Sequence, residues 1–143
     1  YPRDTTKAIE LYVKSGELGC VEAYEDLGTI YTIGRGGVTI NKKKAQYYLE
    51  LAAMKGNVGA RHNLGYWEIQ AGNHDRAMKH YMIAAKAGLD MSLESLKDGF
   101  KMGYITKDEF ADTLRAHQKS TDEMKSDQRD KAARLAFLSG RET

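Results

Sequence analysis

Apolar residues recur every three or four positions over most of this chain, which is the spacing of amphipathic helices. Ala45, Leu49 and Ala52 show the pattern, and Ala77, Tyr81 and Ala84 repeat it. No strand-like alternation persists, and the one proline is Pro2. The pattern predicts helices over about 5–16, 21–33, 41–55, 59–71, 74–87, 91–102, 106–119 and 121–138. Thr106 with Glu109, and Ser120 with Glu123, have the spacing of capping boxes and support the last two starts.

The predicted helices form a repeated unit. Residues 7–28 align with residues 44–65, so that Ala8 falls on Ala45 and Leu27 on Leu64, and 45–64 aligns again with 77–96. The first interval is five residues longer because Gly34–Val38 lengthens one turn. Stacked helix pairs tolerate such a change, since turns protrude while packing fixes the helices. The sequence therefore predicts a stack of two-helix repeats.

Glycines inside the predicted helices indicate close packing. Gly28 and Gly65 occupy equivalent positions, and a helical glycine costs about 1 kcal/mol relative to alanine, so a neighbouring helix is expected to need the space. The third unit has Lys97 at this position. Drift of this kind is expected of a unit that caps the stack. The last predicted helix is apolar in its C-terminal half, at Ala132, Leu135 and Leu138. We expect this C-terminal half to dock on the array.

These residues resemble the Sel-one-like repeat family, a relative of the tetratricopeptide repeat with a longer glycine-rich turn. The shared pattern is Ala23, Leu27-Gly28, Tyr31, Gly34, Gly36-Gly37-Val38, Lys44-Ala45, Tyr48, Ala52-Ala53 and Gly56, with a second copy from Ala60 to Gly88. The resemblance implies an all-α fold, a right-handed α-solenoid of antiparallel helix pairs with a C-terminal capping helix. It also implies a scaffold or adaptor for protein complexes, such as the recruiting part of a ubiquitin-ligase component.

The resemblance also divides the chain, which we expect to be one domain. We expect a partial first repeat at 1–20 (second helix only), repeats at 21–57 and 58–89, a degenerate capping repeat at 90–120, and a C-terminal helix and tail at 121–143. Because the array begins with the second helix of a repeat, we expect preceding repeats to be missing. The apolar end that this leaves would be open to self-association.

In such a stack the first helix of each pair lines the concave surface, so the resemblance implies a groove that binds a protein or peptide. The implied positions are Glu22, Glu25, Thr29, Thr32, His62, Tyr66, Ile69, Glu94, Asp98 and Lys101. Aromatic anchors dominate interface energetics, which makes Tyr66 the centre of the hypothesis. The acidic flanks favour a basic peptide. The alternative, that Tyr66 or Ile69 packs between neighbouring helices, stays open.

Composition and charge limit the classes of partner that the protein is expected to bind. The 143 residues carry 22 basic and 20 acidic side chains, which is not the concentrated positive face that nucleic acid requires. An RNA-binding helical repeat, with Tyr66 and Trp67 as a stacking platform, is the alternative hypothesis and predicts salt-sensitive binding to polyanions. No apolar run approaches the roughly 20 residues of a membrane span.

Candidate chemistry is sparse, so we expect no enzyme, no metal and no cofactor. Cys20 is the single cysteine, which excludes an internal disulfide and favours the cytoplasm without fixing the compartment. His74 and His80 are six residues apart, not the four of a helical zinc site. Gly34–Gly37 lacks the preceding strand and the Lys-Ser/Thr ending of a phosphate loop.

Overall fold

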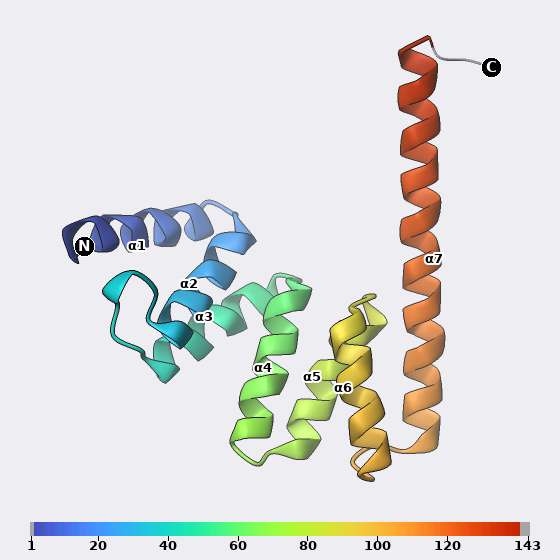
Figure 1. The fold of residues 1–143 in the computed structure, drawn as a ribbon, viewed down its shortest axis with the longest axis horizontal. Helices are drawn as coiled ribbons and strands as arrows, with labels where there is room; N and C mark the ends of the chain where they lie inside the picture. Colours follow the sequence, from blue (N-terminus) through green and yellow to red (C-terminus); the bar gives the residue numbers. More distant parts are fainter. Residues whose placement is uncertain (1, 141–143) are drawn as a thin grey trace.

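The computed structural model describes residues 2–140, with side chains described from Asp4 onward. Within this range the chain is helical, without a β-strand, and successive helices pack side by side (Figure 1). The elements are α1 (Pro2–Glu17), α2 (Val21–Ile33), the short 3-10 helix η1 (Arg35–Gly37), α3 (Lys42–Met54), α4 (Val58–Gln70), α5 (His74–Lys86), α6 (Asp90–Lys101) and α7 (Lys107–Leu138). The predicted all-α solenoid of helix pairs is confirmed.

The core consists of two apolar clusters along the array. The first joins α2, α3 and α4 around the fully buried Leu27 and Leu49, with Trp67 partly buried at its edge. The second joins α5, α6 and the start of α7 around Met78 and Leu96. Each cluster is built from the residues that recur at helical spacing, so the repeat places one apolar layer between successive helices.

Gly28 and Gly65 allow the two helices of a repeat to approach closely. A Cβ atom on Gly28 would lie 2.6 Å from Leu49 Cδ2 in α3, and one on Gly65 would lie 2.6 Å from Tyr81 Cε1 in α5. Both distances are far below van der Waals contact, so the predicted role of these glycines is confirmed.

The turns use side-chain caps and a left-handed glycine. Asn41 and Asn57 cap α3 and α4, since their Oδ1 atoms accept hydrogen bonds from the backbone N–H groups of Lys44 and Ala60. Gly34 ends α2 at φ 71°, a conformation that glycine adopts without strain.

The helix prediction was wrong at the C-terminal end. Instead of helices at 106–119 and 121–138, α7 runs unbroken from Lys107 to Leu138 over 32 residues. The capping box at Thr106 and Glu109 is present, but Ser120 lies inside the helix and donates its hydroxyl to the Lys86 carbonyl oxygen, 2.6 Å away. Ser120 therefore holds α7 against the end of α5 and starts no new helix.

The half of α7 that docks is also the opposite of the predicted one. Phe110 stacks on Phe100 of α6 with ring centroids 5.0 Å apart, Thr113 is fully buried, and His117 Nε2 lies 2.7 Å from Asp90 Oδ1. Leu135 and Leu138 are exposed, because the straight helix carries its late half past the edge of the array (Figure 1).

Candidate protein-binding surface

Two of the predicted groove residues join successive repeats. Glu25 and His62 occupy equivalent positions on α2 and α4. Glu25 Oε2 accepts a hydrogen bond of 2.8 Å from Asn57 Nδ2, the residue that caps α4. The carboxylate thus lies at the N-terminal end of a helix, where the dipole favours negative charge.

His62 makes the corresponding contact one repeat later. Its Nδ1 lies 2.7 Å from the hydroxyl oxygen of Ser92, which is fully buried in the first turn of α6. The ring also contacts Tyr81, with centroids 5.0 Å apart. Burial lowers the pKa of His62 below the ordinary 6.5, so the neutral imidazole is the form that the fold favours.

Several other predicted groove residues form hydrogen bonds or ion pairs within their own helices. Thr29 and Thr32 donate their hydroxyls to the carbonyl oxygens of residues 25 and 28, one turn back. Glu94 pairs with Lys97 at 2.9 Å on the exposed side of α6. Glu22, Tyr66 and Lys101 are exposed, and Tyr66 keeps 55% of its surface accessible. Tyr66 therefore does not pack between helices, whereas Ile69 does so in part.

The remaining two, Ile69 and Asp98, line one recess between α4, α5 and α6. Its volume is about 380 Å³. The other lining residues are His74, Met78, Tyr81, Ser95, Gly99, Met102 and Tyr104. The wall is mostly apolar, with one carboxylate at Asp98. An apolar side chain with a positive charge next to it is the group that such a surface fits.

Gly99 and His74 shape this recess. Gly99 has no side chain to fill the space over the Met78 sulfur, which a Cβ atom would strike. His74 stacks on Tyr104 with ring centroids 4.3 Å apart, and its buried Nδ1 has no hydrogen-bond partner within residues 4–140. Burial raises the pKa of Tyr81, which keeps its hydroxyl protonated and able to donate a hydrogen bond.

Sequence reasoning missed most of the recess because it considered only first helices. Met78 comes from α5, while Met102 and Tyr104 flank the turn glycine after α6. The signal was present: two large apolar residues beside a turn, where polar residues are usual. Met102 is 67% exposed.

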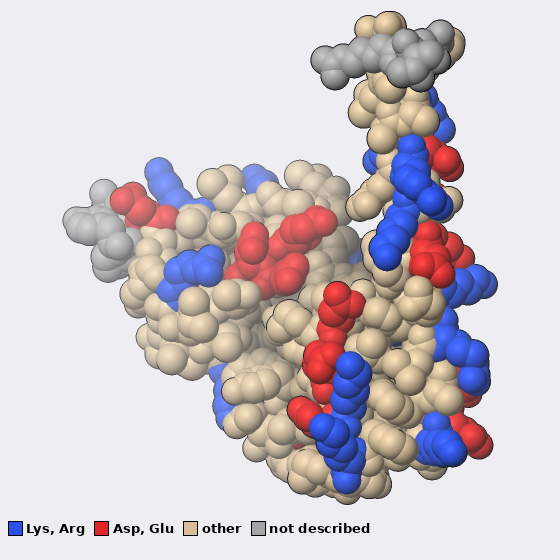
Figure 2. Space-filling model, turned by 45° about the vertical axis from the view of Figure 1, so that its right-hand side comes forward, with Lys and Arg blue, Asp and Glu red and all other residues tan. Residues whose placement is uncertain are grey.

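Charged side chains of both signs are interspersed over the face shown in Figure 2, with tan surface between them. Lys42 and Lys44, from the one lysine cluster, lie over aromatic rings: each Nζ is 5.2 Å from a ring centroid, of Trp67 and Tyr31 respectively. Within the described residues, no three His, Cys, Asp or Glu side chains are grouped to hold a metal ion. None of the described helices is both long and apolar enough to cross a bilayer.

Comparison with known families identifies the repeat. The Sel1 repeat family matches residues 1–20, 21–57 and 58–89, which together exceed half of the chain. The chain belongs to the Sel1 repeat family. Sel1 repeats generally mediate protein–protein interaction. No curated protein and no solved structure matches the chain significantly.

The Sel1 repeat matches cover α1 to α5 and leave α6 and α7 outside them. The assignment of 90–120 as a degenerate capping repeat and of 121–143 as a C-terminal helix and tail therefore stays a prediction. Leu11 and Leu18, in and just after α1, are exposed. Self-association through this N-terminal end also stays a prediction.

Proposed function

We propose that this Sel1 repeat protein is a non-enzymatic scaffold that binds a peptide or protein partner in the recess between α4, α5 and α6. The observation that carries the proposal is the recess itself, with an apolar wall that includes Met102 and one carboxylate at Asp98. Methionine side chains adapt to the shape of a bound partner, and apolar pockets with a polar rim are where binding energy concentrates.

The charge of the recess indicates the kind of partner. Asp98 is the one carboxylate among the residues that line the recess. A peptide with an apolar anchor followed by lysine or arginine would fill the recess and pair with Asp98. In a larger assembly, such as a ubiquitin ligase, the chain would act as the part that recruits such a partner.

The test uses exposed residues, so that loss of binding is separable from loss of folding. Met102→Glu puts a charge into the apolar wall, and Met91→Glu is the matched control, since Met91 is similarly exposed (63% against 67%) at the other end of α6. Asp98→Lys reverses the charge. Binding is measured against a displayed random-peptide library and by pull-down from source cells, with circular dichroism as the folding control.

We expect the library to enrich apolar residues next to basic ones. Met102→Glu should lower affinity for the enriched peptides by about 30-fold or more, which corresponds to about 2 kcal/mol for an anchor pocket. Asp98→Lys should weaken binding most at low salt. Unchanged binding in both variants would exclude the recess, and loss with Tyr66→Ala instead would place the site on the exposed side of α4. Salt-sensitive retention on a polyanion column would support the RNA-binding alternative.

A further inference from the structure

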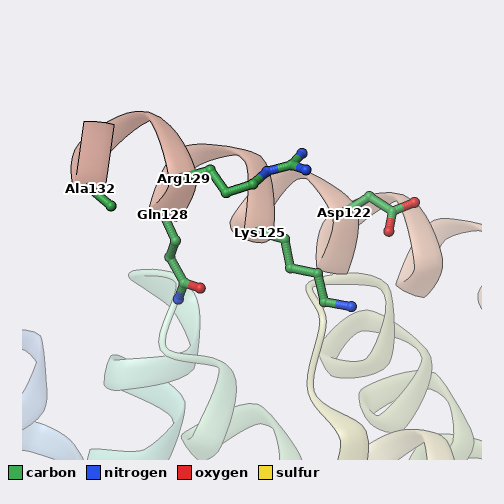
Figure 3. A pocket seen from close by; sticks show the side chains of 5 residues that line it. All are labelled: Asp122, Lys125, Gln128, Arg129 and Ala132. Atoms are coloured by element: carbon green, nitrogen blue, oxygen red, sulfur yellow. The ribbon is translucent and has the colours of Figure 1, made fainter. Parts of the chain in front are cut away.

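Two hollows of the molecule differ in the walls that enclose them. One measures about 520 Å³ and lies beside α7, and all five residues that line it belong to that helix: Asp122, Lys125, Gln128, Arg129 and Ala132. Figure 3 shows Lys125 and Gln128 projecting from the same side of α7. Residues 127–140, which we call the free half of α7, are all exposed and stand clear of the other helices (Figure 1). The recess between α4, α5 and α6 has walls from three helices, so it can bury a side chain of a partner.

The recess has an equivalent place in each of the preceding repeats. The alignment of residues 45–64 with 77–96 continues to the ends of α4 and α6 without a change of length, so Gly99 corresponds to Trp67. The alignment of the first two units makes Ile30 of α2 the third member of this set. Because stacked repeats place equivalent residues in equivalent surroundings, the three units can be compared at this position.

In the first two units, a side chain of the repeat itself occupies this place. Ile30 is buried, with 6% of its surface exposed. Trp67 packs at the edge of the cluster that joins α2, α3 and α4. Lys42, at the start of α3, places its Nζ atom 5.2 Å from the centroid of the Trp67 ring. The second unit thus fills the place with its own aromatic side chain.

The third unit has a glycine at this place. Met78 of α5 reaches into part of the space, since a Cβ atom on Gly99 would strike its sulfur. His74, which corresponds to Lys42 in the alignment, stacks on Tyr104 at the side of the space. The volume that remains is the recess of about 380 Å³. The recess is therefore the place that the second unit fills with an indole ring.

The wall of the recess suits an aromatic ring. Its lining includes two methionines, two tyrosines and one histidine. Thioether sulfur atoms make favourable contacts with aromatic rings, and pairs of aromatic rings gain energy beyond the area that they bury. An aliphatic side chain in the same place would gain from burial alone. The composition of the wall thus favours an aromatic occupant over an aliphatic one.

We propose that the partner anchors itself by an aromatic side chain, with tryptophan preferred, which takes the place in the third unit that Trp67 takes in the second. This inference rests on the proposed function, since it names the side chain that enters the same recess. A lysine or arginine next to the aromatic residue pairs with Asp98. The partner is then a peptide or protein segment with adjacent aromatic and basic residues. Ile30 in the first unit marks the alternative, an aliphatic anchor, and the experiments separate the two.

Methyl NMR tests the anchor with a small probe. The chain is labelled at its methionine methyl groups, and N-acetyl-tryptophanamide or N-acetyl-leucinamide is added at millimolar concentration. We expect the ring current of the tryptophan probe to shift the Met78 and Met102 signals, and the leucine probe to shift them much less. Met91 is the internal control, because it lies at the other end of α6 and is as exposed as Met102 (63% against 67%). A tryptophan probe that shifts Met91 as much as Met102, or shifts neither, would overturn the proposal.

The displayed peptide library distinguishes failure of this inference from failure of the proposed function. Among peptides whose binding is lost in Met102→Glu, we expect tryptophan or phenylalanine at the anchor position. Replacing that residue by leucine should lower the affinity by about 10-fold. Equal binding with leucine or isoleucine at the anchor would overturn the aromatic preference and leave the proposed function standing. If no peptide depends on Met102, the proposed function fails and this inference fails with it.

A transplant of the second unit into the third tests the comparison of the repeats. Three substitutions together reproduce Lys42, Gln46 and Trp67 at the corresponding positions: His74→Lys, Met78→Gln and Gly99→Trp. The fold already packs this set one repeat earlier, so we expect the variant to keep its helical circular dichroism and to lose binding of the probe and the peptides. Met91→Trp adds an indole ring outside the recess and should keep binding. A folded triple variant that still binds would overturn the proposal, and the probe titration decides it without any substitution.

Discussion

Glu25 and His62 join their helix to the next repeat in equivalent ways, with different chemistry. The Glu25 carboxylate accepts from the Asn57 side chain, and the His62 imidazole bonds the Ser92 hydroxyl. Asn57 lies just before the first turn of α4, and Ser92 lies within the first turn of α6. Both helices are the first helix of the next repeat. The positions that flank the leucine and glycine stripe are therefore used for stacking the repeats. This leaves fewer of them for a ligand.

The His62 contact predicts that the protein loses stability in mild acid. Burial lowers the pKa of His62 below 6.5, so the unfolded chain binds a proton more readily than the folded one. The free energy of unfolding should be highest above about pH 6.5 and should fall as the pH drops through the folded-state pKa. His80 adds to the effect, since burial and the nearby Arg61 lower its pKa too.

The measurement is thermal unfolding of wild type and His62→Gln at pH 7.5 and pH 5.5. Glutamine keeps a group that bonds Ser92 but does not titrate, so we expect a smaller difference between the two melting temperatures in the variant. Equal differences in the two proteins would show that His62 does not contribute to the pH dependence.

At the residue scale, the sequence was enough to predict where close helix packing requires a glycine. It was not enough to predict which side chains of neighbouring helices form hydrogen bonds with each other. The absence of a side chain at Gly28 and Gly65 has a local cost, so the need for close approach could be inferred from sequence. The bond between Glu25 and Asn57 spans 32 positions and depends on how two repeats stack. No local pattern encodes that distance.

The ends of the helices show a similar limit at the element scale. Thr106 and Ser120 are each followed three residues later by a glutamate, and the two sites look alike in sequence. Thr106 is preceded by the Gly103 turn and caps α7, whereas the Ser120 hydroxyl bonds the end of α5. The helix continues through Ser120 because the surrounding residues, such as Lys119 and Glu123, favour helix.

The Thr106 cap should contribute measurably to stability. Its hydroxyl accepts from the Glu109 N–H at 3.1 Å, and the Glu109 carboxylate accepts from the Thr106 N–H at 2.9 Å. Thr106→Ala should lower the free energy of unfolding by about 1 kcal/mol, as loss of an N-cap usually does. Thr106→Ser, which keeps the hydroxyl, should stay close to wild type in urea denaturation. A similar loss in both variants would point to the methyl group and not to the cap.

The whole molecule combines a packed array with a projecting helix. The repeat pattern was enough to predict the array, because each unit buries the same apolar positions against its neighbour. The course of α7 was not predictable from its own sequence. Leu135 and Leu138 have the composition of a docking face, but the array ends before a straight helix brings them to it. Most of the recess was missed for a related reason, since its wall combines three helices and a turn.

This division predicts that the free half of α7 adds little to the stability of the array. A chain that ends after residue 126 keeps Thr113, His117 and Ser120, which hold α7 against the array, and the described residues that it loses, 127–140, are all exposed. At protein concentrations where wild type is monomeric, its melting temperature should stay within about 2 °C of wild type. A chain that ends after residue 112 loses the buried Thr113 and both polar contacts, so it should melt at a clearly lower temperature. If the chain that ends after residue 126 is destabilised as much as the chain that ends after residue 112, the free half must contact the array in solution.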